Sequence, residues 1–364
     1  MHPGNHRMSV PRDFSSPAAR DEWSRDLLQL QAQDETRFIE LARELFAFQF
    51  QYVPAYRRLC TAHRLTPEIF TDWRDLPAVP QQLFKHVDLF AHPSQKPAVT
   101  YETSGTTTGQ PGRQHLLSTD VYQTISVEGA RRAGLFKAEP RFLFLVPSAT
   151  DAPHSSLSAM FDGWRKAFRQ PASCFWVRKG RIDFVRLRAA LTEVSGPIAL
   201  CGTAFNFVHL LDAWADLAPL RLPRGSWLLE TGGFKGRSRE IAKPDLYAQL
   251  VRMFSIPDSS IWNEYGMSEL SSQAYAHGTS GLHETPPWAR VLVCDPVTGR
   301  EVPEGQSGLV RWIDLANVDS ILSLQTLDLA ERTLKGFRLV GRLPRTEPRG
   351  CSLGAEDLAL QAAV

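Results

Sequence analysis

The chain has 364 residues, with 41 Lys plus Arg against 39 Asp plus Glu, so its formal net charge is only +2. Hydrophobic residues make up 43% and charged residues 22% of the chain, which is ordinary for a globular protein. These values exclude an intrinsically disordered chain, a collagen-like chain and a protein held to nucleic acid mainly by excess charge. The length has room for about two or three domains or subdomains.

The cysteines and the apolar stretches bear on the cellular compartment. The 5 cysteines include no CxxC pair and are widely spaced, which argues against a disulfide framework or a zinc site. The N-terminus, MHPGNHRMSVPRDF, lacks the apolar run of a signal peptide. The longest uncharged stretch, residues 194–211, is too polar for a membrane span. We expect a cytoplasmic protein with no membrane span and no nucleic-acid partner.

The N-terminal part of the sequence predicts a helical segment. Apolar residues recur every three or four positions from about 18 to 52, and Pro54 is expected to stop the run. The segment 76–85, LPAVPQQLFK, reads as a proline-broken connection followed by a short helix.

Short apolar runs then alternate with helical stretches. The expected strands are 98–102, 142–146, 174–177, 198–201, 226–229 and 261–263. The expected helices between them include 183–193 and 238–254. This alternation predicts an α/β sheet whose functional loops follow the strand ends. Further on, strand-like runs at 290–294 and 308–313 flank the turn-rich DPVTGREVPEGQ, which favours a β-hairpin or a small barrel.

The segment 103–113, TSGTTTGQPGR, combines 5 hydroxyl side chains with 3 glycines directly after an expected strand. Glycines allow backbone N–H groups to approach an anion, and hydroxyls add donors for phosphate oxygens. The GxxxxGK[ST] pattern of a P-loop is absent. A flexible polar loop is the alternative.

Two further segments point to the same chemistry. ETGGFKG at 230–236 again places glycines after a strand, and NEYGMSE at 263–269 places an aromatic residue, a glycine and carboxylates after a strand expected at 260–262. A carboxylate there can hold Mg²⁺ beside phosphates, and a tyrosine can stack on a purine. Taken singly, each such segment is more often an ordinary turn carrying a surface acid.

The order of these segments along the chain is similar to a known series of motifs. TSGTTTGQPG, TGG, NEYGMSE, QTLDLAE and VGRLPRTEPRG resemble the ordered motifs of the adenylate-forming superfamily, which includes acyl-CoA and aryl-CoA ligases. CDPVTGREVPEGQSGLV resembles a hairpin of that superfamily, and the likeness covers about residues 76–350. Within it, the chain is most similar to the acyl-protein synthetases of the LuxE type, through LPAVPQQLFK, LETGGFKGRSREI and the short end after RGCSLGAEDL. Phenylacetate-CoA ligases are similar but continue into a C-terminal domain.

The resemblance implies an α/β fold of layered subdomains plus a small β-barrel, with the superfamily's C-terminal domain largely missing. The adenylate-forming domain would span residues 1–340, including the helical segment at 18–52 and a β-rich subdomain at 287–340. Residues 341–364 would form a short tail in place of the usual mobile domain.

The resemblance also implies ATP and Mg²⁺ as cofactors and assigns roles to matching positions. The residues that would cradle the ATP phosphates are Ser104, Gly105, Thr106, Thr107 and Gly109. The residues that would line the adenine and acyl side or border the nucleotide are Gly232, Gly233, Tyr265, Gly266 and Met267. Glu269 would bind Mg²⁺, Asp328 would hydrogen-bond the ribose hydroxyls and Arg342 would lie at a hinge near the ribose. For Asp328, whose motif matches more loosely, an aspartate in a turn after a strand is the alternative.

Two departures from the superfamily concern positive charge. Its phosphate loop usually ends in Pro-Lys, and this loop reads Pro111-Gly112-Arg113, so Arg113 is a candidate cation for the phosphates. The superfamily's catalytic lysine lies in the C-terminal domain that we expect to be missing. Because attack on the α-phosphate builds negative charge, some cation should compensate. Lys235 in TGGFKG is our hypothesis for that cation, and an ordinary surface lysine is the alternative.

Cys351 is a further candidate. Proteins of the LuxE type carry a C-terminal cysteine that accepts the acyl group as a thioester, and RGCSL places Cys351 after Arg342. Nearby cations such as Arg345 and Arg349 lower a thiol pKa and raise the thiolate fraction. A small buried hydrophobic residue is the alternative, which we expect for the cysteines at 174, 201 and 294.

His154 lies where the superfamily often lines the acyl pocket, although a polar loop histidine is equally compatible. Four aromatic residues are candidates for an acyl tunnel, with buried core as the favoured alternative: Phe161, Trp164, Phe175 and Trp176.

We therefore expect ATP-dependent activation of a carboxylic acid, with a fatty acid favoured, to an acyl-adenylate. The acyl group would pass to Cys351 and on to a partner such as a fatty acid reductase, with Lys235, Glu269 and Arg342 as the other catalytic residues. One alternative hands the acyl group to CoA, a carrier protein or an amine. An alternative of another class is a non-catalytic scaffold that binds nucleotide or partner proteins.

Overall fold

The computed structural model describes residues 12–103, 110–232 and 241–343. Its N-terminal layer consists of the helices α1 (Pro17–Gln29), α2 (Glu35–Tyr52) and α3 (Pro54–Ala62). The prediction of one helix over 18–52 was therefore wrong at residues 30–34. Asp34 accepts a hydrogen bond from the backbone N–H of Arg37 and so caps a new helix there. Pro54 does end α2, but it also begins α3, because proline fits the first turn of a helix.

The connection at 76–85 has the predicted form. Val79 and Pro80 form β1, which pairs in parallel with β14 (Ser323–Arg332), and the short helix η2 (Gln81–Lys85) follows. This pairing fixes Lys85 beside the C-terminal sheet. Two further short strands, β2 (Val99–Glu102) and β3 (Arg113–Leu116), pair antiparallel on either side of residues 103–112.

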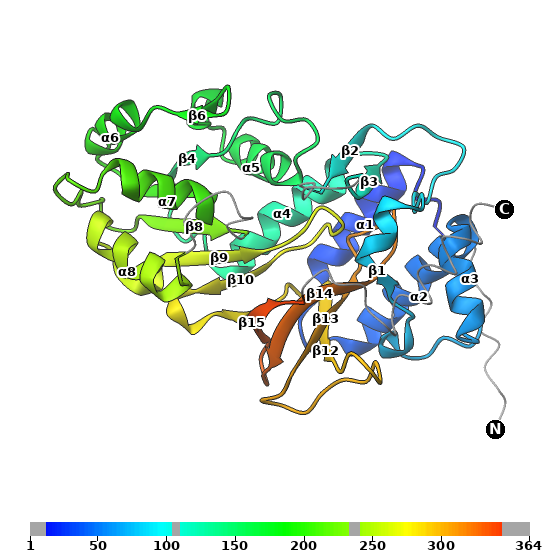
Figure 1. Ribbon diagram of the computed structural model, residues 1–364. Helices are drawn as coiled ribbons and strands as arrows, with labels where there is room; N and C mark the ends of the chain where they lie inside the picture. Colours follow the sequence, from blue (N-terminus) through cyan, green and yellow to red (C-terminus); the bar gives the residue numbers. More distant parts are fainter. Residues whose placement is uncertain (1–11, 104–109, 233–240, 344–364) are drawn as a thin grey trace.

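A five-stranded sheet in the order β10-β9-β8-β7-β4 forms the centre of the α/β part (Figure 1). Its strands are β4 (Arg141–Leu145), β7 (Ile198–Thr203), β8 (Trp227–Thr231), β9 (Ile261–Tyr265) and β10 (Ala274–His277). Only β10 runs antiparallel to its neighbour. The strands expected at 142–146, 198–201, 226–229 and 261–263 are thus confirmed.

Helices cover both faces of this sheet (Figure 1). One face packs against α6 (Phe184–Thr192), α7 (Ala204–Ala213) and α8 (Lys243–Phe254). The other packs against α4 (Asp120–Ala133) and α5 (Ser156–Ala167). Because successive side chains of a strand point to opposite faces, Leu200 joins the first core and Cys201 the second. The helices expected at 183–193 and 238–254 are confirmed as α6 and, from Lys243 onward, as α8.

Two strand predictions needed correction. The run at 174–177 is mostly a 3₁₀ turn, η3 (Ala172–Cys174), followed by the two-residue strand β5 (Val177–Arg178), which pairs with β6 (Arg181–Ile182). The strand expected at 260–262 begins at Ile261 and runs on to Tyr265, so Glu264 and Tyr265 lie inside it rather than in a loop. The remaining 3₁₀ turns are η1 (Trp73–Asp75), η4 (Asp258–Ser260) and η5 (Gly278–Ser280).

The C-terminal third forms a second sheet in the order β11-β15-β14-β13-β12. Its strands, besides β14, are β11 (Leu282–His283), β12 (Ala289–Cys294), β13 (Ser307–Asp314) and β15 (Phe337–Arg342). The hairpin expected around DPVTGREVPEGQ is confirmed as β12–β13. Strand pairing within the described chain stops at β11 and β12, so this is an open sheet rather than a closed barrel.

The N-terminal helices pack on this second sheet in one shared core. Gln49 of α2 holds the loop between β13 and β14 through two hydrogen bonds. It donates to the backbone oxygen of Asn317 at 2.8 Å and accepts from the backbone N–H of Leu322 at 2.8 Å. None of the helices in the described part of the chain is long and apolar enough to cross a bilayer.

Candidate active site

A cavity of about 1510 Å³ opens where the parallel strands end. Its lining includes Thr203 at the end of β7, Thr231 at the end of β8 and Tyr265 at the end of β9. It also includes residues of η2, α5, β14 and β15, so the two sheets meet at this cavity. The carboxyl end of a parallel sheet is the expected place for a ligand in an open α/β fold.

Three residues singled out in the sequence lie together on one side of the cavity. The Tyr265 hydroxyl donates a hydrogen bond of 2.8 Å to Asp328 Oδ2, and Arg342 Nη1 lies 3.5 Å from Asp328 Oδ1. Asp328 and Arg342 are direct partners across β14 and β15. Asp328 therefore lies inside a strand, and the alternative of an aspartate in a turn was wrong.

Glu269 lies on the same side of the cavity as these residues and is buried, with 6% of its surface exposed. Burial raises the pKa of Glu269 to about 7, and the charges of Arg342 and Lys85 oppose that shift while the charge of Asp328 adds to it. Within the described residues no cluster of three acidic, histidine or cysteine side chains forms a metal cage. A single buried carboxylate fits Mg²⁺, which usually takes one or two carboxylates and completes its shell with phosphates and water.

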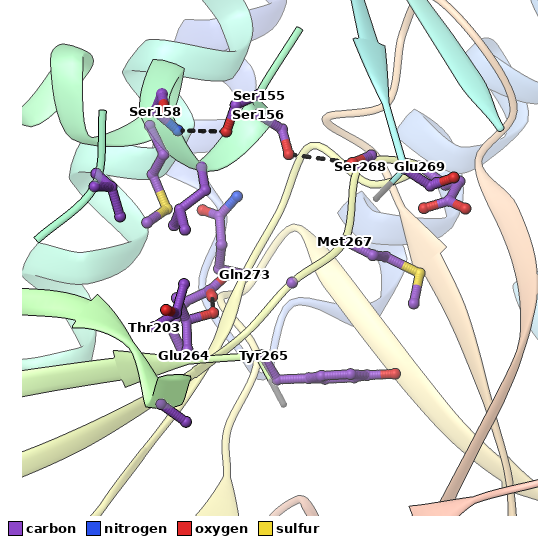
Figure 2. Close-up of a pocket in the computed structure, with 18 of the residues that line it drawn as sticks. Ser155, Ser156, Ser158, Thr203, Glu264, Tyr265, Met267, Ser268, Glu269 and Gln273 are labelled. Carbon is purple, nitrogen blue, oxygen red and sulfur yellow. Dashed lines mark hydrogen bonds between the residues drawn. The ribbon is translucent and has the colours of Figure 1, made fainter. Parts of the chain in front are cut away.

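The backbone of the segment NEYGMSE bends, so that its side chains point to two sides of the cavity. Figure 2 shows Tyr265, Met267 and Glu269 on one side of this segment, and Glu264 and Thr203 on the other. At the bend, a Cβ on Gly266 would contact the Glu264 carboxylate, so a larger residue there would displace that side chain. Gly232 has φ of +70°, in the left-handed region that favours glycine, so the turn after β8 depends on glycine.

Glu264 lies on the second side of the cavity and is 6% exposed. The Thr231 hydroxyl donates a hydrogen bond to its Oε2. Burial raises the pKa of Glu264 to about 7, and the Glu230 carboxylate adds to the shift. The sequence analysis did not single out Glu264, because the expected strand ended before it.

A polar network at the cavity wall, centred on the buried Glu230, was also missed. Glu230 Oε1 accepts hydrogen bonds from Tyr247 at 2.9 Å and Asn263 at 2.8 Å, and Lys243 Nζ lies 3.1 Å away. Asn263 Oδ1 lies 2.7 Å from His283 Nε2. Burial, with the charge of Lys243, lowers the pKa of His283 to about 3, so this imidazole stays neutral. The network fixes the ends of β8 and β9 relative to α8.

Lys85 is another cavity-lining residue that the sequence analysis did not single out, although it ends the segment LPAVPQQLFK. Its proximity to Glu269 follows from η2 packing beside β14. Arg113, by contrast, is exposed, lies 3.7 Å from Glu102 and does not line the cavity.

His154 lies at the cavity wall, where its Nδ1 is 2.9 Å from the backbone oxygen of Thr100. The four aromatic candidates for an acyl tunnel are absent from the lining within the described chain. Phe161, Trp164 and Phe175 are buried in the core beneath the sheet, with Trp176 partly buried, which confirms the core interpretation.

Several predicted site residues lie outside the described residues. They are Ser104, Gly105, Thr106, Thr107, Gly109, Gly233, Lys235 and Cys351. The four described cysteines are buried with unpaired thiols: Cys60, Cys174, Cys201 and Cys294. Burial raises the pKa of each, to about 12 for Cys60 and about 11 for Cys174. The core interpretation of Cys174, Cys201 and Cys294 is confirmed.

The chain is similar in sequence to known acyl-protein synthetases and their relatives. The family model of the acyl-protein synthetases named LuxE matches residues 23–358. Long-chain-fatty-acid–luciferin-component ligase of Vibrio harveyi is 23% identical over 353 residues, covering 91% of this chain and 89% of the relative. The protein of that name from Aliivibrio fischeri is 22% identical over 361 residues, covering 93% and 91%.

Solved structures share the fold. An open conformation of 2-hydroxyisobutyryl-CoA ligase, in complex with 2-HIB-AMP and CoA, has a TM-score of 0.64 at 18% identity. That similarity covers 90% of this chain and 79% of the ligase. ATP-bound MatB from Rhodopseudomonas palustris has a TM-score of 0.50 at 16% identity over 68% of this chain and 48% of MatB. The α/β fold predicted from the sequence is thus the fold of adenylate-forming ligases.

Proposed function

The chain belongs to the LuxE family of acyl-protein synthetases and is therefore an acid–thiol ligase, and we propose that it activates a carboxylic acid with ATP and carries the acyl group on Cys351. The observation that carries this proposal is the convergence of Tyr265, Asp328, Arg342 and Glu269 on one side of a large cavity.

Each of these groups has a task in acid activation. The substrate carboxylate attacks the α-phosphorus, the bond from that phosphorus to the bridging oxygen breaks, and pyrophosphate leaves with the electron pair. The Tyr265 ring offers a face to adenine, and the Asp328 carboxylate accepts hydrogen bonds from the ribose hydroxyls. Arg342 lies beside Asp328, where a guanidinium stabilises charge on a neighbouring phosphate.

Glu269 is the residue that would hold Mg²⁺. When bound, the ion neutralises phosphate charge as pyrophosphate departs. The buried Glu269 carboxyl has no charged hydrogen-bond partner among the described residues, so ionisation there requires compensation from Lys85, Arg342 or a metal. A cation bound there would offset the cost of the buried charge.

We propose that Lys85 contributes positive charge to the adenylation step. Lys85 lines the cavity, and its positive charge lowers the pKa of Glu269. Lys235 remains our second candidate for this task. A cation positioned where negative charge develops lowers the barrier most when it is fixed before the reaction, and η2 fixes Lys85 through the pairing of β1 with β14.

The state of the other thiols supports Cys351 as the proposed acyl acceptor. The four described cysteines are buried and their pKa values are raised, so their thiolate fractions at neutral pH are very small. Cys351 is the fifth cysteine, and the family match extends beyond it to residue 358. In the second step its thiolate attacks the acyl carbonyl carbon, the bond from that carbon to the phosphate oxygen breaks, and AMP leaves.

The substrate and partner are proposed from the relatives. Two relatives are named for a long-chain fatty acid and a luciferin component, and we propose a long-chain acid substrate here with a reductase as the protein that receives the acyl group. Transfer to CoA, a carrier protein or an amine remains the alternative for the second step.

Acid-dependent pyrophosphate release tests the first step. The purified chain is incubated with Mg²⁺, ATP and acids of graded length, and Asp328→Ala runs beside it. Release that needs the acid and falls in the variant supports adenylation. Absence of release with every acid, while ATP still raises the melting temperature, would instead favour a nucleotide-binding scaffold.

A further inference from the structure

The second side of the cavity contains an acidic group that adenylation itself does not use. Glu264 lies in β9 between Thr231 of β8 and Tyr275 of β10, its direct partners in the sheet. Its side chain leaves the strand on the face opposite to Tyr265, and Figure 2 shows it beside Thr203 and away from Glu269. Glu264 therefore faces the part of the cavity lined by residues of β7, β8 and α5, which we call the compartment, and Tyr265, Asp328 and Arg342 lie on the other side.

The cavity lining includes several apolar side chains. Among them are Val146, Leu157, Met160, Ala204 and Phe205. Such side chains fit the aliphatic part of an acid, since ligand cavities are mainly apolar with a few polar groups that select the ligand.

Ser158 and Gln273 are polar lining residues on the same side of the cavity as Glu264. Ser158 of α5 is 1% exposed, and its hydroxyl has no hydrogen-bond partner in the described part of the chain. Gln273 lies across from it, as Figure 2 shows. A buried hydroxyl left without a partner costs free energy, so Ser158 marks a place where a bound molecule would complete the hydrogen bonding.

The partners of Glu264 itself are also incomplete. It accepts the Thr231 hydroxyl, and in the described ranges no Lys, Arg or His forms an ion pair with it. The charge that contributes to its raised pKa is that of another carboxylate, Glu230. A buried carboxylate without a counter-charge is unfavourable, and a hydrogen-bond donor supplied by a ligand relieves that cost.

We propose that the substrate is an aliphatic acid bearing a hydrogen-bond-donating substituent, a hydroxyl or an ammonium, and that Glu264 binds this substituent. This inference rests on the proposed function, because it defines the acid that the same cavity activates. Ser158 and Gln273 would complete the hydrogen bonds of the substituent, while the apolar lining residues contact the rest of the chain.

A matched acid panel tests the proposal. Pyrophosphate release by the wild-type chain is measured with hexanoic, decanoic and tetradecanoic acids and with their α-hydroxy, β-hydroxy, ω-hydroxy and ω-amino derivatives. We expect one substituted acid to exceed its parent in kcat/KM by at least about tenfold, since a site built to bind a polar group rejects an analogue that lacks it.

Two variants separate the two kinds of substituent. Glu264→Leu removes the acceptor and is expected to reverse the preference in favour of the unsubstituted parent. Glu264→Gln keeps an acceptor oxygen but no charge, so it retains a preference for a hydroxyl and loses one for an ammonium. Glu304→Leu, at an exposed glutamate in the loop between β12 and β13, is the control and should leave the preference unchanged.

The failures are distinguishable. If wild-type protein uses unsubstituted acids as well as or better than every substituted one, the inference is wrong while the proposed function stands. If no acid releases pyrophosphate, the proposed function itself fails. The wild-type panel decides the matter even where a Glu264 variant does not fold.

Discussion

The Tyr265 hydroxyl donates a hydrogen bond of 2.8 Å to Asp328, and this contact joins the two sheets at the cavity. Tyr265 ends β9 of the parallel sheet, and Asp328 lies in β14 of the C-terminal sheet. The bond fixes an aromatic face and a carboxylate relative to one another before any ligand binds. Such preorganisation reduces the entropy lost on binding.

Loss of this hydrogen bond is the first prediction. Tyr265→Phe retains the ring but no longer orients the Asp328 carboxylate, so we expect the KM for ATP to rise by about tenfold, the cost of one hydrogen bond to a charged group. The maximal rate should change much less. Steady-state kinetics with varied ATP checks this, with Tyr56→Phe in the buried helical layer as the control. An unchanged KM would show that the contact is only structural.

Lys85 gives the second prediction. Lys85→Met keeps much of the side-chain length but removes a cavity-lining cation whose charge acts on Glu269. We therefore expect the maximal adenylation rate to fall about a hundredfold, as on loss of one transition-state donor. Lys96→Met, in an exposed stretch of the following loop, should have no effect. Single-turnover formation of acyl-AMP makes the measurement. A loss confined to Lys235→Met would transfer the role to Lys235.

The third prediction concerns Mg²⁺ and pH. Burial raises the pKa of Glu269 to about 7, and only the ionised carboxylate binds the metal. The Mg²⁺ concentration needed for half-maximal rate should therefore fall as the pH rises through about 6 to 8. In Glu269→Gln this pH dependence should disappear and the Mg²⁺ requirement should rise. Glu264 titrates in the same range, and persistence of the pH dependence in Glu264→Gln would assign it to Glu269.

Protein stability provides the fourth prediction. The pKa of Glu264 is about 7 when folded, above its ordinary value of 4.5. The folded state therefore binds more protons between these values, and the contribution of Glu264 to stability is lost as the pH rises. Glu264→Gln should thus gain stability relative to wild type as the pH rises from about 4 to 8, by about 3 kcal/mol in all. Urea unfolding across this range measures the difference. A constant difference would contradict a raised pKa.

Much of the fold was predictable because its signals are local. The strands β4, β7 and β8 lie between two apolar cores, which produces short continuous apolar runs in the sequence. The break between α1 and α2 was missed although the apolar spacing lapses between Leu30 and Phe38, where the Asp34 cap is a single polar residue. The run at 174–177 misled because burial alone does not distinguish a strand from a turn packed on a sheet.

The site was predictable where motifs lie within one segment. Tyr265, Asp328, Arg342 and Glu269 come together as the motif order suggested. Lys85 and Glu264 were missed because their importance arises from distant contacts. Lys85 reaches the cavity only through the pairing of β1 with β14, and Glu264 faces it only because β9 extends to Tyr265. Neither relationship is visible in residue spacing.

Intact-mass spectrometry of the chain after incubation with Mg²⁺, ATP and the acid panel tests the central claim most directly. We predict an acyl adduct on wild-type protein that hydroxylamine removes, as expected for a thioester, and that is absent from Cys351→Ser while pyrophosphate still forms. Cys294→Ser, at a buried thiol, should keep the adduct. Pyrophosphate release without any adduct on wild-type protein, or an adduct that persists in Cys351→Ser, would contradict the account.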